Sequence, residues 1–178
     1  MSLYFVPMPY LIVLRGPIGA GKTSLLHSLA KQLPHSSVIE VDALKRMLDP
    51  YASSDWRRET AFEAALFMAK RALATGRNII TETHSKQPEQ QQHFSELARR
   101  TPGSIYKSVL VTAPLKVCKE RSQARYVPGI QYAIDDQMVE SYYAGLDPLP
   151  EEVVIDTSKV SSQSGALIII KTLTTSKE

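Results

Sequence analysis

A glycine-rich stretch near the start of the chain constrains its fold more strongly than any other segment. Residues 16–23 read GPIGAGKT, a full match to the pattern GxxxxGK followed by Ser or Thr, and they directly follow the apolar run YLIVL at 10–14. In this pattern a strand ends in a turn that opens into a helix, so backbone N–H groups and the positive end of a helix dipole converge where a polyphosphate can sit. The alternative, a chance glycine turn, is disfavoured because apolar residues at helical spacing follow in 24–33.

The residue types in this stretch each suit a bound nucleotide. Glycine permits the positive φ angles and the close backbone approach that a side chain would obstruct. The Lys22 side chain would reach the β- and γ-phosphates, and the Thr23 hydroxyl would ligate Mg²⁺. We therefore expect ATP and Mg²⁺ as the ligands. The residues expected to hold the nucleotide here are Gly16, Gly19, Ala20, Gly21, Lys22, Thr23 and Ser24.

The rest of the chain reads as an alternation of strands and helices. Strands are predicted at 10–15, 37–41, 78–82, 105–112 and 152–156. Helices are predicted at 24–33, from the capping cluster 53–55 to Gly76, and at 88–100 and 115–125. The β-branched run 167–170 suits a strand by propensity, but its place after the fifth strand favours a closing helix. This order is typical of an α/β fold with a five-stranded parallel sheet and helices on both faces.

Length and composition limit the classes of protein that need be considered. With 178 residues, 43% of them hydrophobic and 22% charged, the chain suits one globular domain over 1–178. Its longest apolar runs, 11–14 and 167–170, are far shorter than the roughly 20 residues that cross a bilayer. The segment 1–9 lacks the basic start of a signal peptide, and the single cysteine, Cys118, cannot form an internal disulfide. We expect a cytoplasmic protein without a membrane partner.

Two acidic residues stand where strands of the predicted sheet end, which is where ligands of open parallel sheets bind. Asp42 follows the second strand and is the candidate general base that would deprotonate an acceptor hydroxyl. It could also cap a helix that begins at Ala43, and the two roles can coexist. Glu82 ends the third strand and is the candidate acid that organises Mg²⁺, with a solvated strand end as the alternative.

Several further polar residues lie near these positions. His84, two residues after Glu82, is a candidate for contact with the acceptor, although lone histidines often have no catalytic part. Lys45 and Arg46 follow Asp42 by about one helical turn and would bind an acidic group on the acceptor, unless they are ordinary surface charge. Asp156 ends the fifth strand and is assigned to the nucleotide site.

A pair of arginines suggests a mobile lid. Arg121 and Arg125 are four residues apart on a predicted helix and therefore share a face. The sequence YVPGI at 126–130 then breaks that helix, as a lid over the phosphates at about 119–136 would require. Guanidinium groups on such a lid would stabilise the γ-phosphate only when the lid is closed. The alternative for this pair is a solvated basic face.

Taken together, these residues resemble the P-loop kinases of the group that contains polynucleotide 5′-hydroxyl kinases, zeta toxins and the phosphotransferases that act on gluconate or chloramphenicol. The matching parts are the phosphate loop, Asp42, the stretch VCKER at 117–121 with Arg125, and the segment 60–78. The resemblance implies a P-loop NTPase fold with a small helical lid. It also implies Asp42 as general base, Lys45 as a contact to a phosphate on the acceptor, and the segment 154–158 against the adenine.

This chain departs from that group where the acceptor is chosen. Lys45 replaces the usual arginine, and the strand end Glu82-Thr83-His84 is closer to the Glu-Gly-Thr of zeta toxins than to the Asp-Ala-Thr-Asn of polynucleotide kinases. The net charge of +3 and the 7% of aromatic residues do not favour a nucleic-acid groove. The leading hypothesis is therefore transfer of the γ-phosphoryl group of Mg-ATP to a hydroxyl of a small molecule. A 5′-hydroxyl polynucleotide kinase, a nucleotide-dependent switch or ATPase module, and a nucleic-acid-binding protein without catalysis are the alternatives.

Overall fold

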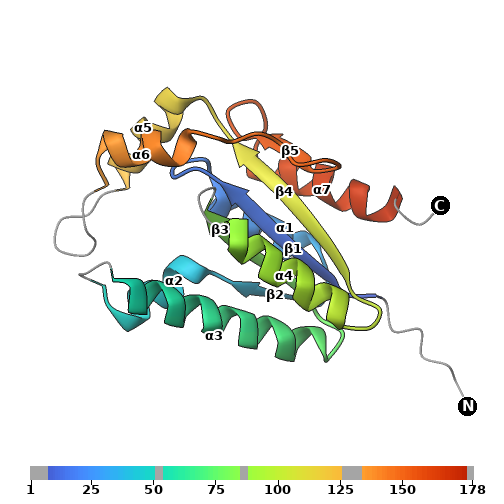
Figure 1. Ribbon diagram of the computed structural model, residues 1–178. Coiled ribbons are helices and arrows are strands. Elements are labelled where there is room, and N and C mark those ends of the chain that lie inside the picture. The colour runs from blue at the N-terminus through green and yellow to red at the C-terminus, as the bar shows by residue number, and fades with distance from the viewer. Residues whose placement is uncertain (1–7, 51–53, 85–87, 126–133, 176–178) are drawn as a thin grey trace, which may run out of the picture.

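The computed structural model describes residues 8–50, 54–84, 88–125 and 134–175. Five strands form one parallel sheet in the order β2-β3-β1-β4-β5, with β1 in the centre. Figure 1 shows this sheet between two layers of helices. The strands are β1 (Tyr10–Gly16), β2 (Ser36–Ile39), β3 (Asn78–His84), β4 (Ile105–Thr112) and β5 (Val153–Asp156).

The helices follow the strands in turn. They are α1 (Lys22–Gln32), α2 (Val41–Leu48), α3 (Asp55–Leu73), α4 (Pro88–Arg100), α5 (Leu115–Ala124), α6 (Asp136–Tyr143) and α7 (Ser162–Thr175). The predicted five-stranded parallel α/β fold is confirmed, and 167–170 lie in a helix, α7, as favoured. None of the helices within the described ranges is long and apolar enough to cross a membrane.

Alternating residues of β1 divide the core into two halves. Ile12 and Leu14 are fully buried against α1 and α7 on one face of the sheet. Leu11 and Val13 are fully buried against α3 and α4 on the other face. A strand buried on both faces reads as a continuous apolar run, which is why 10–14 carried so clear a strand signal. This central strand fixes the position of the loop that follows it.

Two strand ends differ from the prediction by two residues, and the other strand boundaries agree to within one residue. The second strand ends at Ile39 rather than at Val41, because Val41 already lies in the first turn of α2. The third strand continues to His84 rather than stopping at Glu82. Its last three residues pair with β1, with Leu14, Arg15 and Gly16 as their partners. The extra pairing holds the end of β3 beside the start of the phosphate loop.

The predicted lid falls only partly within the described residues. Helices α5 and α6 are described, whereas 126–133, which include the predicted helix break at 126–130, lie outside the described residues. On the described part, the Lys119 Nζ donates to Glu140 Oε1 at 2.6 Å and lies 3.3 Å from Asp136 Oδ2. This ion-pair network holds α5 and α6 together.

Candidate active site

The phosphate loop joins β1 to α1 and packs tightly against the backbone of β4 and α5. Gly19 has φ +81°, and a Cβ there would come within 2.2 Å of the Cys118 carbonyl oxygen in α5. A Cβ at Gly16 would come within 2.0 Å of the Val111 carbonyl oxygen in β4. Gly21 is the N-cap of α1, in the left-handed conformation with φ 90°. The glycines are therefore needed for the shape of the loop as well as for approach of a ligand.

Lys22 holds its ammonium group against the loop. Its Nζ donates to the carbonyl oxygens of Gly16 and Pro17, both at 3.0 Å. Burial lowers the pKa of Lys22, and the nearby carboxylates of Glu82 and Asp42 oppose that effect. The cation thus lies between the backbone of the loop and the two acidic residues that the sequence singled out.

Glu82 is brought to Thr23 at the start of α1. The Thr23 hydroxyl donates to Glu82 Oε2 at 3.4 Å, and Glu82 is only 4% exposed, so it is not a solvated strand end. Burial raises the pKa of Glu82, and the negative charge of Asp42 adds to this effect. The positive charge of Lys22 opposes both. A hydroxyl and a carboxylate oxygen are ligands that Mg²⁺ takes together with substrate phosphates and water. The described residues hold no cluster of three or more His, Cys, Asp or Glu side chains suited to a metal. The pair therefore fits a Mg²⁺ that is shared with a nucleotide.

Asp42 lies in the first turn of α2, not ahead of the helix. The N-cap of α2 is Glu40, so the interpretation of Asp42 as cap of a helix from Ala43 is wrong. Its Oδ1 accepts from Lys45 Nζ at 3.0 Å and lies 3.2 Å from His84 Nε2. Burial alone would raise the pKa of Asp42, but His84 and Lys45 together hold it well below its usual range. Burial lowers the pKa of His84, against the effect of Asp42.

The two basic residues of α2, Lys45 and Arg46, have different surroundings. Lys45 is buried beside Asp42, whereas Arg46 is exposed on α2. Both residues lie within about one helical turn of Asp42, but it is Lys45 whose Nζ binds the Asp42 carboxylate. The expectation that both stand at the acceptor site therefore has geometric support only for Lys45.

These side chains line a narrow gap that has no open space for a water-sized molecule. Its walls lie so close together that a ligand enters only if they move apart. Seven of its eight lining residues are of polar or charged types. The residues that line it are Lys22, Val41, Asp42, Lys45, Glu82, Thr83, His84 and Gln90.

The ring of Tyr142, in α6, lies edge-on against His84, with ring centroids 5.3 Å apart. Helix α6, which is distant from β3 in the sequence, thereby contacts the end of β3. A motion of α6 would change the surroundings of His84.

Arg121 in α5 and Arg125, the C-cap residue of that helix, differ in their contacts. Arg121 donates from Nη1 to the Thr157 hydroxyl at 2.7 Å and from Nη2 to the Thr157 carbonyl at 3.1 Å. The Thr157 hydroxyl in turn donates to the Ala20 carbonyl of the phosphate loop at 2.8 Å. Arg125 is exposed one turn later, where its Nε donates to the Arg121 carbonyl at 3.3 Å. Thr157 belongs to the segment 154–158 that the resemblance placed against the adenine, but sequence reasoning assigned this residue no role of its own.

Asp156 is engaged in a local turn. Its Oδ1 accepts from the backbone N–H of Ser158 at 3.0 Å and from the Ser158 hydroxyl at 2.6 Å, and its Oδ2 pairs with Lys159 at 3.2 Å. The hydrogen bond from the Ser158 side chain lowers the pKa of Asp156. The carboxylate shapes the loop that carries Thr157, and its assignment to the nucleotide site stays a prediction.

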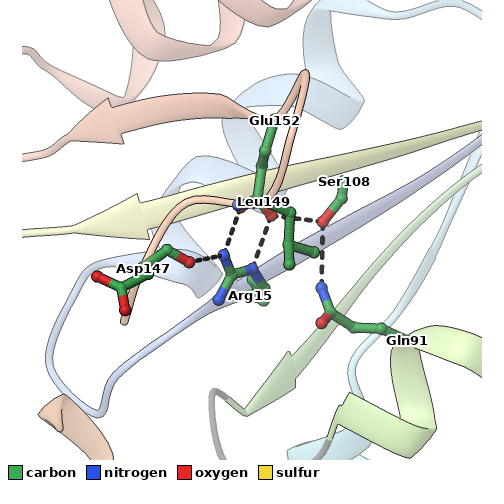
Figure 2. A network of polar contacts seen from close by, with 6 residues as sticks. All are labelled: Arg15, Gln91, Ser108, Asp147, Leu149 and Glu152. Atoms are coloured by element: carbon green, nitrogen blue, oxygen red, sulfur yellow. Dashed lines mark hydrogen bonds and ion pairs between the residues drawn. The ribbon is translucent and has the colours of Figure 1, made fainter. Parts of the chain in front are cut away.

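Sequence reasoning also missed a buried ion pair between Arg15, the residue before the phosphate loop, and Glu152. Arg15, 5% exposed and next to Gly16, donates from Nε to Glu152 Oε1 at 2.7 Å and also binds Glu152 Oε2 through Nη2. Figure 2 shows that Glu152 further accepts from Ser108 and from the Leu149 N–H. Residues bonded around the pair are Gln91, Ser108, Asp147 and Leu149. The network ties β1 and β4 to the connection between α6 and β5.

Known proteins resemble the chain over most of its length. A family model described as an AAA domain matches residues 11–149. The probable adenylyl-sulfate kinase of Pyrococcus abyssi (strain GE5 / Orsay) is 30% identical over 170 residues, which cover 91% of this chain and 93% of the relative.

Solved structures share the fold. The APS kinase of Mycobacterium tuberculosis, solved in complex with AMPPNP and APS, has a TM-score of 0.65 at 17% identity, with 94% of this chain and 98% of that chain covered. A Chloroflexus aurantiacus J-10-fl protein assigned as a kinase has a TM-score of 0.72 at 20% identity, with 92% and 98% covered.

Proposed function

The chain belongs to the AAA domain family and has the fold of the P-loop kinases, and from this premise we propose that it transfers the γ-phosphoryl group of Mg-ATP to a hydroxyl of a small molecule. The observation that carries the proposal is the placement of Asp42. Its carboxylate shares one narrow gap with Lys22 and Glu82, the residues expected to meet the phosphates and the metal. A base and a phosphate site that face the same space are what transfer to a hydroxyl requires.

The donor half of the site is assigned to the loop and its neighbours. Backbone N–H groups of 19–24 and the Lys22 ammonium bind the phosphates. Thr23 and Glu82 hold Mg²⁺, which when bound neutralises charge on the phosphate oxygens. Arg121, held beside the loop by Thr157, and Arg125 add positive charge around the γ-phosphate. Asp156 remains assigned to the nucleotide through the loop that it shapes.

The acceptor half of the site is assigned to Asp42 and its two partners. Lys45 and His84 both bind Oδ1, which fixes the plane of the carboxylate. The same contacts keep Asp42 ionised, so it can accept the proton of a hydroxyl that enters the gap. Orientation of the hydroxyl towards the γ-phosphate is the larger part of this role, since phosphoryl transfer depends mainly on positioning and electrostatics.

Composition favours a small molecule over a polynucleotide end. The net charge of +3 and the 7% of aromatic residues do not suit a nucleic-acid groove. The Pyrococcus relative is named as an adenylyl-sulfate kinase, so adenylyl sulfate belongs first in a panel of acceptors.

The test is transfer of label from γ-labelled ATP and Mg²⁺ to such a panel. It would contain adenylyl sulfate, sugars, sugar acids, nucleosides and 5′-hydroxyl oligonucleotides, with Asp42→Asn beside the wild type. Asp55→Asn is the matched control, because it removes a carboxylate from the first turn of α3 where the side chain is 80% exposed. We expect labelled product from the wild type and the control but not from Asp42→Asn. Acceptor-independent ATP hydrolysis without any labelled product would favour an ATPase module and contradict the proposal.

A further inference from the structure

Helix α3 carries two exposed aromatic side chains on the face that points away from the core. Trp56 is 59% exposed and Phe67 is 65% exposed. The eleven positions between them amount to about three helical turns, so the two side chains share a face. Ala61, Ala65 and Ala69 are fully buried on the opposite side of the helix. Figure 1 shows α3 along the lower side of the molecule, on the outside of its helix layer.

The same helix also has an aromatic residue that serves the core. Phe62 is 9% exposed and meets Phe94 of α4 edge-on, with ring centroids 5.5 Å apart. Among the phenylalanine and tryptophan residues that the structure describes, Trp56 and Phe67 are the exposed ones, and both belong to α3. A single exposed apolar residue is ordinary, whereas aromatic residues aligned on one face are typical of an interaction surface.

The spacing along this face is that of a helix that packs against a second helix. Steps of four and three residues alternate along it, which is the 3.5-residue repeat of a two-helix seam. All the residues at these positions are exposed or half-buried. We call this row the α3 seam. It consists of Trp56, Thr60, Glu63, Phe67, Lys70 and Ala74.

Charge changes sign between the two halves of the α3 seam. Glu63 lies in the first half, and Glu59, one helical turn earlier, is exposed beside it. Lys70 lies in the second half and is exposed. Arg58 is two residues from each of its seam neighbours, so it points off the seam, and it pairs with Asp55. A parallel copy of the helix would therefore place like charges together, whereas an antiparallel copy places the lysine opposite the glutamates.

We propose that the α3 seam binds a second copy of this chain, with the two α3 helices antiparallel and related by a two-fold axis. Lys70 of each copy then lies between Glu59 and Glu63 of the other, and both sets of ion pairs form at once because the axis repeats every contact. Phe67 is covered near the axis, and Trp56 meets the small side chain of Ala74. The inference goes beyond the proposed function and does not rest on it.

Sedimentation equilibrium of the full chain, from about 1 to 500 μM, gives the first test. Contact along one helix makes an interface below about 1,200 Å², which is typical of weak association, so we expect monomer at the lowest concentration and dimer at the highest. Phe67→Ser should weaken the dimer by about tenfold or more. Leu167→Ser is the matched control, because it changes a side chain of α7 that is 52% exposed. Far-UV circular dichroism checks that both variants fold. Monomer at every concentration, or a dimer lost in Leu167→Ser and kept in Phe67→Ser, would overturn the inference.

Reversal of charge tests the antiparallel pairing. Lys70→Glu places like charges opposite each other in its own dimer, and so does Glu59→Lys/Glu63→Lys, so each variant alone should associate more weakly than the wild type. A mixture of the two should form a heterodimer that is tighter than either homodimer, because opposite charges then meet at both ends.

Lys116→Glu controls for net charge, since it makes the same change at a lysine of α5 whose side chain is 88% exposed. It should associate like the wild type and should bind Glu59→Lys/Glu63→Lys less tightly than Lys70→Glu does. If Lys70→Glu associates as tightly as the wild type, or if both lysine variants bind Glu59→Lys/Glu63→Lys equally, the antiparallel pairing is refuted.

Discussion

The buried pair of Arg15 and Glu152 is expected to respond very differently to loss of one partner and loss of both. The Glu152 side chain has no exposed surface and accepts from Arg15, Ser108 and Leu149. Glu152→Gln leaves the Arg15 guanidinium buried without a counter-charge. Such a loss costs about 3–5 kcal/mol, a large share of the roughly 5–15 kcal/mol by which a domain is stable. Arg15→Met should cost a similar amount, since it leaves Glu152 uncompensated.

The double variant Arg15→Met/Glu152→Leu removes both charges and keeps similar volume. Ser108 retains its bond from Gln91 at 3.1 Å, and the backbone groups of Asp147 and Leu149 belong to exposed residues that water can reach. We therefore expect the double variant to lie within about 1–2 kcal/mol of the wild type. The loss would then be several kcal/mol smaller than the sum of the two single losses, which marks a direct interaction.

Urea unfolding followed by far-UV circular dichroism measures these differences. Fluorescence is less suitable, because the single tryptophan, Trp56, is 59% exposed in the folded chain. Glu96→Gln is the matched control, because Glu96 also accepts from two arginines, Arg99 and Arg100, but does so at the surface. Its midpoint should stay near wild type. A wild-type midpoint for Glu152→Gln, or a double loss equal to the sum of the single losses, would refute the reasoning.

The same pair predicts a pH dependence of stability. Burial disfavours the ionised form of Glu152, but hydrogen bonds from Arg15 and Ser108 outweigh it and hold the pKa of Glu152 below its ordinary value of 4.5. A carboxyl whose pKa is depressed by folding contributes stability above its unfolded pKa and loses it as pH falls through the folded pKa. The stability difference between wild type and the double variant should therefore shift in favour of the variant below about pH 4.5. A difference that does not change with pH would contradict this account.

Three further predictions concern the phosphate loop. Gly19→Ala should weaken ATP binding and lower the urea midpoint, because its Cβ would meet the Cys118 carbonyl at 2.2 Å; wild-type ATP affinity measured by calorimetry would contradict this. Thr157→Val should raise the KM for ATP and cost about 1 kcal/mol of stability, because it removes the bond to the Ala20 carbonyl; an unchanged KM and midpoint would exclude that link. Lys22→Met should weaken ATP binding at least tenfold and lower the urea midpoint, because the Gly16 and Pro17 carbonyls lose their donor; wild-type ATP affinity or an unchanged midpoint would contradict this.

Local patterns made part of this structure predictable. The phosphate loop, β1 and α1 follow from one contiguous motif, because a strand, a glycine turn and a helix adjoin in sequence. The buried run 10–14 and the capping residue Ser54, whose hydroxyl accepts from the Arg57 N–H at 3.2 Å, were equally local signals. The proximity of Asp42, Glu82 and His84 was predictable because all parallel strands deliver their ends to one edge of the sheet.

The remaining features depend on contacts between distant segments. Arg15 and Glu152 are 137 positions apart, and neither residue type in isolation predicts a buried pair. Thr157 contacts Ala20 from the same distance along the chain. The start of α2 was misplaced by two residues, because Val41 fits the apolar pattern of a strand as well as that of a helix. The difference between Lys45 and Arg46 also depends on a contact, because Lys45 is buried where its Nζ binds Asp42.

The central claim is that Asp42 activates a hydroxyl for attack on the γ-phosphate of ATP. Single-turnover transfer from labelled ATP to the best acceptor of the panel, in wild type and in Asp42→Asn, tests it most directly. The account predicts a transfer rate about 10²- to 10⁴-fold lower in the variant, the usual contribution of a general base, with an unchanged Kd for ATP. A variant that binds ATP equally well and transfers its phosphoryl group at the wild-type rate would contradict the account.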